Sequence, residues 1–176
     1  MTGFRLGRPI FVAAAMGMSL FCATPAGAQQ VGVAGAVNPA SSATLGTSVR
    51  VLELGSPIIH NEHLRTSAAG SLQVVFLDKT TLSIGPSSDI VINSFVYDPE
   101  RQSGTMALTL GKGVLRVVGG NVTHTGGATV TTPVATIGIR GGIATISHDR
   151  RSGTRAVNGY GVVTVASRGA RGGATP

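Results

Sequence analysis

The chain has 176 residues and a formal net charge of +7, and 42% of its residues are hydrophobic while only 12% are charged. This composition excludes global disorder, which requires low hydrophobicity, and it excludes a coiled coil, which requires a charged helical repeat. The single cysteine, Cys22, excludes a disulfide scaffold, and the length suits one domain with a core of its own.

Residues 1–28 have the three parts of a cleavable signal peptide. Arg5 and Arg8 give a basic start, residues 10–23 form an apolar run, and Ala26-Gly27-Ala28 is a small-residue cleavage site. The run has about 14 residues whereas a membrane-spanning helix needs roughly 20, so we expect cleavage rather than an anchor. No later apolar run is long enough to span a membrane. The sequence therefore predicts a periplasmic or secreted bacterial protein without cysteine.

Residues 29–48 are small and polar without periodicity, which predicts a flexible lead-in. Over residues 49–166 apolar residues alternate with polar ones in short runs, which is typical of strands with one buried face. Turn residues recur about every 8–12 residues, as they do in all-β domains. We expect an all-β domain of about ten to twelve short strands and little or no helix. Residues 167–176 predict a disordered tail.

Three segments carry specific backbone expectations. In Asp78-Lys79-Thr80-Thr81 the Asp78 side chain is expected to accept a hydrogen bond from the backbone N–H two residues further on. Gly111-Lys112-Gly113 predicts a hairpin turn and Gly141-Gly142 another turn between strands.

Few aromatic residues are available for a thick core, which favours a solenoid or a rolled sheet over a deep sandwich.

No motif for catalysis or for a cofactor stands out. The sequences GxxxxGK[ST] and GxSxG are absent, and a Ser-His-Asp triad or a carboxylate pair would leave no local signature. His60 and His63 flank Glu62, but on a strand the two histidines face opposite sides, and His124 and His148 are isolated. We expect no enzyme, no metal site and no cofactor.

The positive charge does not indicate a nucleic-acid partner. Removal of Arg5 and Arg8 with the signal peptide lowers the net charge from +7 to +5, and aromatic residues for base stacking are scarce. An exported protein also leaves the compartment that holds nucleic acid. The charge favours an anionic envelope surface or an acidic partner instead.

Four segments follow one another in a pattern that is specific. They are LRTSAAGSLQVVFLDKTTLSIGPSSDIVI, NSFVYDP, LTLGKGVLRVVGG and VTTPVATIGIRGG, within residues 64–148. In order and spacing they resemble the FecR domain, including its D-x-T-x-L, l-x-G-x-x-R and V-x-T-P-x-A-x-x-x-x-R-G-T segments. The resemblance implies a single FecR-like domain over 49–166, folded as a β-solenoid-like or rolled antiparallel sheet. These motifs are structural rather than catalytic.

The chain also departs from the family pattern. FecR regulators carry a cytoplasmic anti-sigma segment and a transmembrane helix before the domain, whereas this chain starts with a signal peptide. The C-terminal module that receives a transporter's signalling domain is not recognisable after Asp149, and Gly142 stands where the family usually has Thr. The resemblance therefore implies an exported stand-alone FecR-domain protein.

These observations predict a non-catalytic protein-binding or scaffold module of the cell envelope, accessory to cell-surface signalling. Its partner is expected to be an envelope protein or a second copy, with no nucleic acid and no membrane span after signal cleavage. Arg140 and Arg116, both at family-motif positions, are the candidate partner-binding residues. For Arg140 the alternative is a structural role in capping nearby carbonyls. The alternative functions are envelope-glycan binding and an adhesin-like structural role.

Overall fold

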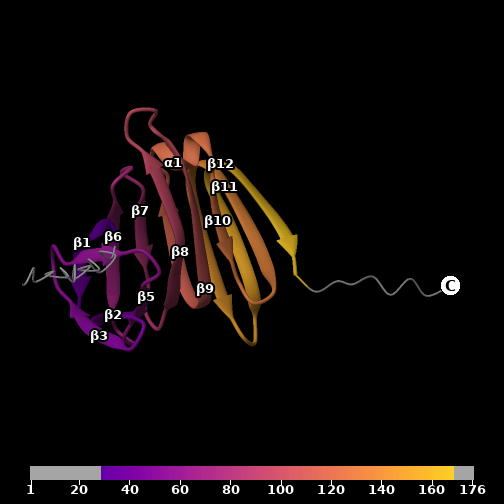
Figure 1. The fold of residues 1–176 in the computed structure, drawn as a ribbon. Coiled ribbons are helices and arrows are strands. Elements are labelled where there is room, and N and C mark those ends of the chain that lie inside the picture. Colours follow the sequence, from indigo (N-terminus) through magenta and orange to yellow (C-terminus); the bar gives the residue numbers. More distant parts are fainter. Residues whose placement is uncertain (1–28, 169–176) are drawn as a thin grey trace, which may run out of the picture.

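The computed structural model describes residues 29–168, so the predicted signal peptide and residues 169–176 of the predicted tail lie outside the described residues. The described part forms twelve strands and one short helix (Figure 1). The elements are β1 (Gln30–Asn38), β2 (Ser41–Leu45), β3 (Ser48–Leu52), β4 (Pro57–Ile59), β5 (His63–Thr66), β6 (Ser71–Phe76), β7 (Thr81–Ile84), β8 (Asp89–Asp98), β9 (Ser103–Val118), α1 (Asn121–Thr125), β10 (Ala128–Thr131), β11 (Ala135–Asp149) and β12 (Gly153–Ser167). Nothing helical between residues 29 and 168 has the length and apolarity to cross a membrane.

All twelve strands belong to one sheet that curls into two layers. Residues 103–112 of β9 pair with β8 and β10, whereas residues 113–118 pair with β7 and β11. The first layer therefore has the order β3-β2-β5-β8-β9-β10-β11-β12, and the second has the order β4-β1-β6-β7-β9-β11-β12. Every pair is antiparallel except β9 with β10. The result is a curled antiparallel sheet, a half-barrel, which confirms the predicted all-β rolled architecture (Figure 1).

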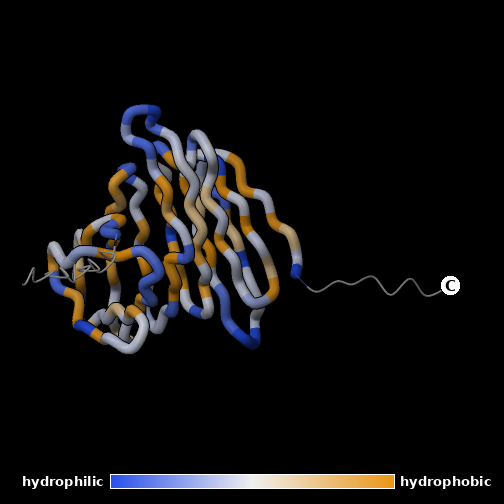
Figure 2. The backbone as a smooth tube through the Cα atoms, in the orientation of Figure 1, coloured by the Kyte–Doolittle hydropathy of each residue, from blue (hydrophilic) through white to orange (hydrophobic). Residues whose placement is uncertain are grey.

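One hydrophobic core lies between the layers. The alternation predicted for residues 72–76 and 82–84 is observed, because each second residue on β6 and β7 is buried. Phe76 and Phe95 are the buried aromatic residues of the described core, with ring centroids 5.0 Å apart. Valine, leucine and isoleucine supply most of the rest, while hydrophilic residues gather in the connections (Figure 2).

β9, β11 and β12 pass from one layer to the other at corners that contain glycine. Gly113, Gly142 and Gly161 have φ angles of +98°, +68° and +93°, a region that side chains disfavour. A Cβ on Gly142 would overlap the carbonyl oxygen of Tyr160, so the corner of β11 lies directly against that of β12. Gly111-Lys112-Gly113 and Gly141-Gly142 were predicted as turns between strands, and that prediction is wrong. Both lie inside continuous strands of 16 and 15 residues, which are also longer than predicted.

Residues 30–45 differ from the predicted flexible lead-in. β1 lies between β4 and β6, and β2 lies between β3 and β5. Val31, Ala34 and Ala43 are buried there. The strand signal was missed because these strands use small residues, and Gly32 lies so close to the backbone of Val75 that a Cβ would not fit. The sheet therefore starts before residue 49.

The Asp78 side chain links α1 to the β6–β7 turn through hydrogen bonds. This carboxylate is fully buried, and its Oδ1 accepts a hydrogen bond from the Thr80 N–H at 3.0 Å, as predicted. Its Oδ2 accepts the Thr80 hydroxyl at 2.6 Å and the Val122 N–H at 3.0 Å. The Thr80 hydroxyl in turn accepts the Gly120 N–H at 3.0 Å. The D-x-T motif thus satisfies backbone donors at the start of α1, which is a structural role.

Gly142→Ala is expected to lower the free energy of unfolding by more than about 3 kcal/mol, because it adds a clash with the β12 backbone to the cost of a positive φ. Gly153→Ala is the matched control, since Gly153 has φ +76° but no atom lies within 4 Å of the place that its Cβ would take. The control should lose about 1–2 kcal/mol. Urea unfolding followed by circular dichroism measures both, and equal losses would contradict close packing of the corners.

Candidate functional site

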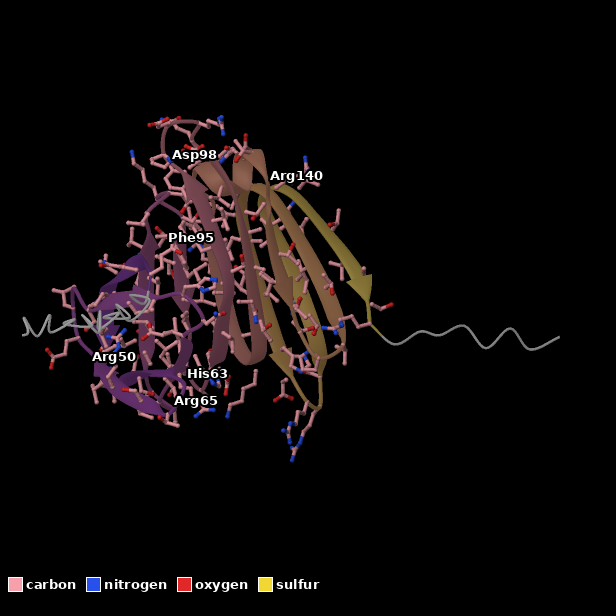
Figure 3. All side chains as sticks on the ribbon, in the orientation of Figure 1. Arg50, His63, Arg65, Phe95, Asp98 and Arg140 are labelled. Atoms are coloured by element: carbon pink, nitrogen blue, oxygen red, sulfur yellow. The ribbon has the colours of Figure 1, made fainter. Side chains whose placement is uncertain are left out.

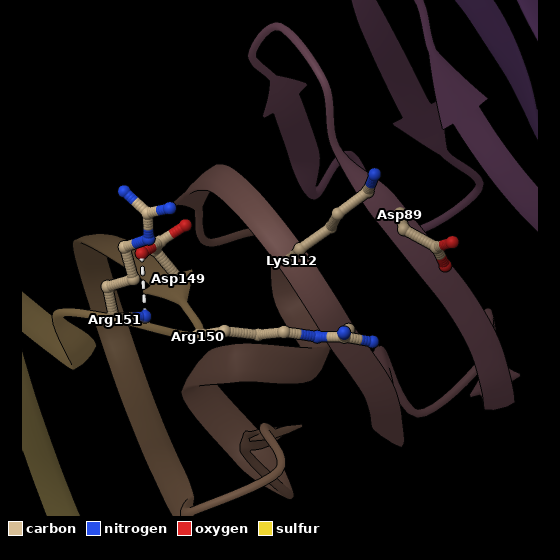
Figure 4. A pocket seen from close by; sticks show the side chains of 6 residues that line it. Asp89, Lys112, Asp149, Arg150 and Arg151 are labelled. Carbon is tan, nitrogen blue, oxygen red and sulfur yellow. Dashed lines mark hydrogen bonds between the residues drawn. The ribbon is translucent and has the colours of Figure 1, made fainter.

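A basic groove lies where the corner of β9 meets the β11–β12 hairpin (Figure 4). It has a volume of about 670 Å³, and a neighbouring depression of about 390 Å³ shares Lys112 and Asp149 with it. The groove is lined by Asp89, Gly111, Lys112, Asp149, Arg150 and Arg151. Three cationic side chains therefore line one opening together with two carboxylates.

Both carboxylates of the groove are engaged by the protein itself. Asp149 Oδ1 accepts hydrogen bonds from the backbone N–H groups of Arg151 at 2.8 Å and Ser152 at 3.3 Å, and these bonds hold the pKa of Asp149 below its usual value (Figure 4). Asp89 contacts His63 Nε2 and accepts a hydrogen bond from Arg65 Nε at 3.2 Å. The groove is thus a surface that attracts anionic groups.

The pKa of Asp89 reflects two opposing effects. Partial burial acts to raise it, and the hydrogen bonds and positive charges of His63 and Arg65 outweigh burial, so that the pKa lies below its ordinary value of 3.8. Asp89 is therefore ionised at neutral pH. It links β5 to β8 at the side of the groove, which helps to position the start of β8 beside Lys112.

Glu62 and His63, which neighbour His60 in the sequence, have separate partners in the described structure. Buried Glu62 accepts hydrogen bonds from Arg50 Nη2 at 2.7 Å and Nε at 3.1 Å, and its other oxygen accepts the Ile59 N–H at 2.9 Å. His63 faces Asp89 instead. Across residues 29–168, no group of three His, Cys, Asp or Glu side chains is placed to hold a metal ion.

The second feature is the edge formed by β12. This strand has 15 residues and pairs, within the described part of the chain, with β11 alone. Four large apolar side chains on it are between 47% and 73% exposed: Val157, Tyr160, Val162 and Val165. A long edge with free backbone groups and exposed apolar residues is a template for pairing with another chain.

The two arginines predicted from the sequence lie apart. Arg140 is exposed at the end of the first-layer segment of β11, opposite Val162 of β12, and Figure 3 shows it at the far side of the molecule from Arg50. Arg116 is exposed on the second layer, between Ser83 of β7 and Thr145 of β11. The corner of β11 separates Thr145 from Arg140, so the two arginines do not form one site.

Sequence reasoning missed the basic groove. Lys112 stands alone in its segment, and Arg150-Arg151 is a short basic pair that resembles any exposed hairpin turn. They come together because β9 and β11 pair in the second layer, with Gly113 opposite His148. A contact of this kind has no local signal in the sequence.

Asp89→Asn is expected to make the protein slightly less stable at pH 7, by up to about 1 kcal/mol, because His63 and Arg65 lose a charged partner. A pKa lowered by folding gives stability that is present above the ordinary pKa and is lost as the pH falls through the lowered folded value. The difference between variant and wild type should therefore shrink below pH 3.8. Urea midpoints at pH 7, 5, 4 and 3 test this, and a difference that stays constant to pH 3 would contradict it.

Comparison with known proteins agrees with the motifs. The FecR protein family matches residues 62–164, which include the Asp78 motif, the corners of β9 and β11 and most of β12. No curated protein matches the chain. A solved structure described as a cell surface anchoring domain is 29% identical over 35% of this chain and 82% of its own, with a TM-score of 0.33, too low to indicate a shared fold.

FecR family proteins are envelope-associated and act in regulation or signalling rather than as enzymes. The matched residues make up well over half of the 176-residue chain, and they lie in a continuous part of the curled sheet. The predicted resemblance is thereby confirmed, and this chain belongs to the FecR family.

Proposed function

We propose that this chain is a non-catalytic protein-binding module of the cell envelope, accessory to cell-surface signalling. It acts in the periplasm or outside the cell after residues 1–28 are removed. Membership of a regulatory family supports a binding role. The observation that carries the proposal is the long, exposed edge of β12.

An edge strand binds through two kinds of contact. Free N–H and C=O groups give affinity by adding a strand to the sheet, and pockets between alternate side chains give specificity. Here Val162 and Val165 supply apolar contacts, and exposed Arg140 lies opposite Val162, next to the edge. Arg140 is therefore proposed to contact the bound chain, and Arg116, two strands from the edge, to make a secondary contact.

A photo-crosslinking residue placed in the exported protein at position 162 or 140 is expected to give crosslinks to an envelope protein or to a second copy. The same residue at position 96 is the control, because Val96 is 61% exposed but lies on β8, which does not pair with β12. Mass spectrometry identifies the bands. Equal crosslinking from all three positions, or none from 162 and 140, would contradict the proposal.

The basic groove favours a second candidate function, the binding of acidic envelope glycans. Its support is the convergence of Lys112, Arg150 and Arg151 on one opening whose carboxylates are already engaged. Such a ligand would meet positive charge on two sides of the groove, from the corner of β9 and from the β11–β12 hairpin.

Replacement of Lys112, Arg150 and Arg151 by Ala is expected to weaken binding to purified peptidoglycan at least tenfold in about 0.5 M salt, where the Debye length of roughly 4 Å screens unspecific attraction. Replacement of Lys79, Arg101 and Arg116 by Ala removes the same charge elsewhere and should leave binding unchanged. Binding by the wild type that disappears at this salt concentration would reject the glycan function.

A further inference from the structure

The two ends of the curled sheet differ in how their edges are protected. At one end β4 has three residues and starts with Pro57, and β3 has five residues with Arg50 bonded to buried Glu62. Short strands, proline and an inward charge all hinder pairing with another chain. At the other end β12 has 15 residues, contains no proline and carries Arg155 as its single charge. The β12 end of the sheet therefore lacks the features that hinder strand pairing at the β3 and β4 end.

The register with β11 shows which way the β12 side chains point, because residues directly opposite in an antiparallel pair share a face. Before the corner, the partners of buried Ala144, Ile146 and His148 are Asn158, Ala156 and Thr154. After the corner, the partners of buried Ile139, Ile137 and Ala135 are Val163, Val165 and Ser167. The inward positions are therefore even-numbered before the corner and odd-numbered after it.

The side-chain contacts agree with this assignment. The Thr154 hydroxyl lies 2.9 Å from Nδ1 of buried His148 and 2.8 Å from the hydroxyl of buried Thr132. Val163 and Ala156 pack against the core from β12. Asn158 Nδ2 donates to the Gly161 carbonyl at 2.9 Å, which holds the corner in shape. The edge is thus a preformed surface, with its inward residues fixed by the strand beside it.

This change of parity makes β12 complementary to itself. If a second β12 runs antiparallel about a two-fold axis between Tyr160 and Gly161, each inward residue before the corner meets an inward residue after it. The inward pairs are Thr154 with Ser167, Ala156 with Val165, and Asn158 with Val163. Arg155 falls opposite Ala166 of the second copy, and the two Arg155 residues are separated by about 36 Å of strand, well beyond the Debye length of roughly 8 Å.

We propose that β12 pairs with β12 of a second copy in this register, which joins two half-barrels into a symmetric dimer. The inference rests on the proposed function, because it names the occupant of the same edge. The register uses nearly all of the 15-residue strand, about 50 Å of edge. Its main-chain hydrogen bonds would match in number the roughly 10 direct hydrogen bonds of a typical interface. Val163 and Val165 of each copy become covered where they lie opposite Asn158 and Ala156 of the other copy.

Two lysine variants of the full-length chain test the dimer by sedimentation equilibrium. Val165→Lys should raise the dissociation constant of the dimer about 100-fold or more, because each dimer would cover two unpaired ammonium groups. Val49→Lys is the matched control on edge strand β3, where Val49 is 68% exposed, and it should leave the constant unchanged. A wild type that is monomeric at every concentration, or a dimer that Val165→Lys leaves intact, would overturn the proposal.

Disulfide formation tests the register itself. In a full-length Cys22→Ser background, a protein carrying Ala156→Cys mixed with one carrying Val165→Cys should form a disulfide on mild oxidation, because opposed residues lie within disulfide range. Each variant alone, and Ala156→Cys mixed with Val163→Cys, should form far less. Efficient crosslinking in the control mixture would overturn the register.

The outcomes separate this inference from the proposed function. A monomer that still crosslinks from position 162 to a different envelope protein would keep the protein-binding function and reject the dimer. A dimer that is insensitive to Val165→Lys, together with no crosslinks from position 162, would reject both.

Discussion

Where β11 and β12 pass from one layer to the other, their backbones lie so close that no β-carbon fits between them. Gly142 lies against the Tyr160 carbonyl, and a Cβ on Gly161 would approach the Arg140 carbonyl oxygen to 2.8 Å. The corner of β11 is bonded in turn to the end of β9, since the Gly119 N–H donates to the Gly142 carbonyl at 2.7 Å. These contacts keep the two layers at one spacing, and the thin core of branched aliphatic residues fits that spacing.

Two buried carboxylates stabilise parts of the fold that lie away from the glycine corners, namely α1 and strand β3. Asp78 secures α1, and Glu62 links β3 to β4 by accepting hydrogen bonds from Arg50 and from the Ile59 N–H. Each is buried with its oxygens accepting hydrogen bonds, the condition under which a buried polar group costs little. The D-x-T motif of the FecR family therefore has a structural role, because its Asp78 holds α1 beside the β6–β7 turn. The contact surfaces that we propose lie elsewhere, on β12 and at the groove beside Lys112.

The sequence predicted what depends on local pattern. The period-two runs of β6 and β7 and the Asp78 turn were recognisable because the chemistry lies within a few residues. β1 was missed because glycine and alanine, which allow close strand packing, also resemble a linker. The corners were taken for turns because both need glycine at positive φ. The groove was unpredictable because only the pairing of β9 with β11 brings Lys112 to the β11–β12 hairpin.

The contrast between the two ends of the sheet has a consequence for how large an assembly can become. A protein with two compatible edges can add copies head to tail without limit and grow into a fibre. Here the β3 and β4 end carries exposed Val49 and Val51, but its short strands, Pro57 and the Arg50–Glu62 ion pair make it a much shorter template than the edge of β12. In the proposed dimer, edge-to-edge growth would stop once each β12 is paired, so the chain could carry an exposed strand without forming filaments.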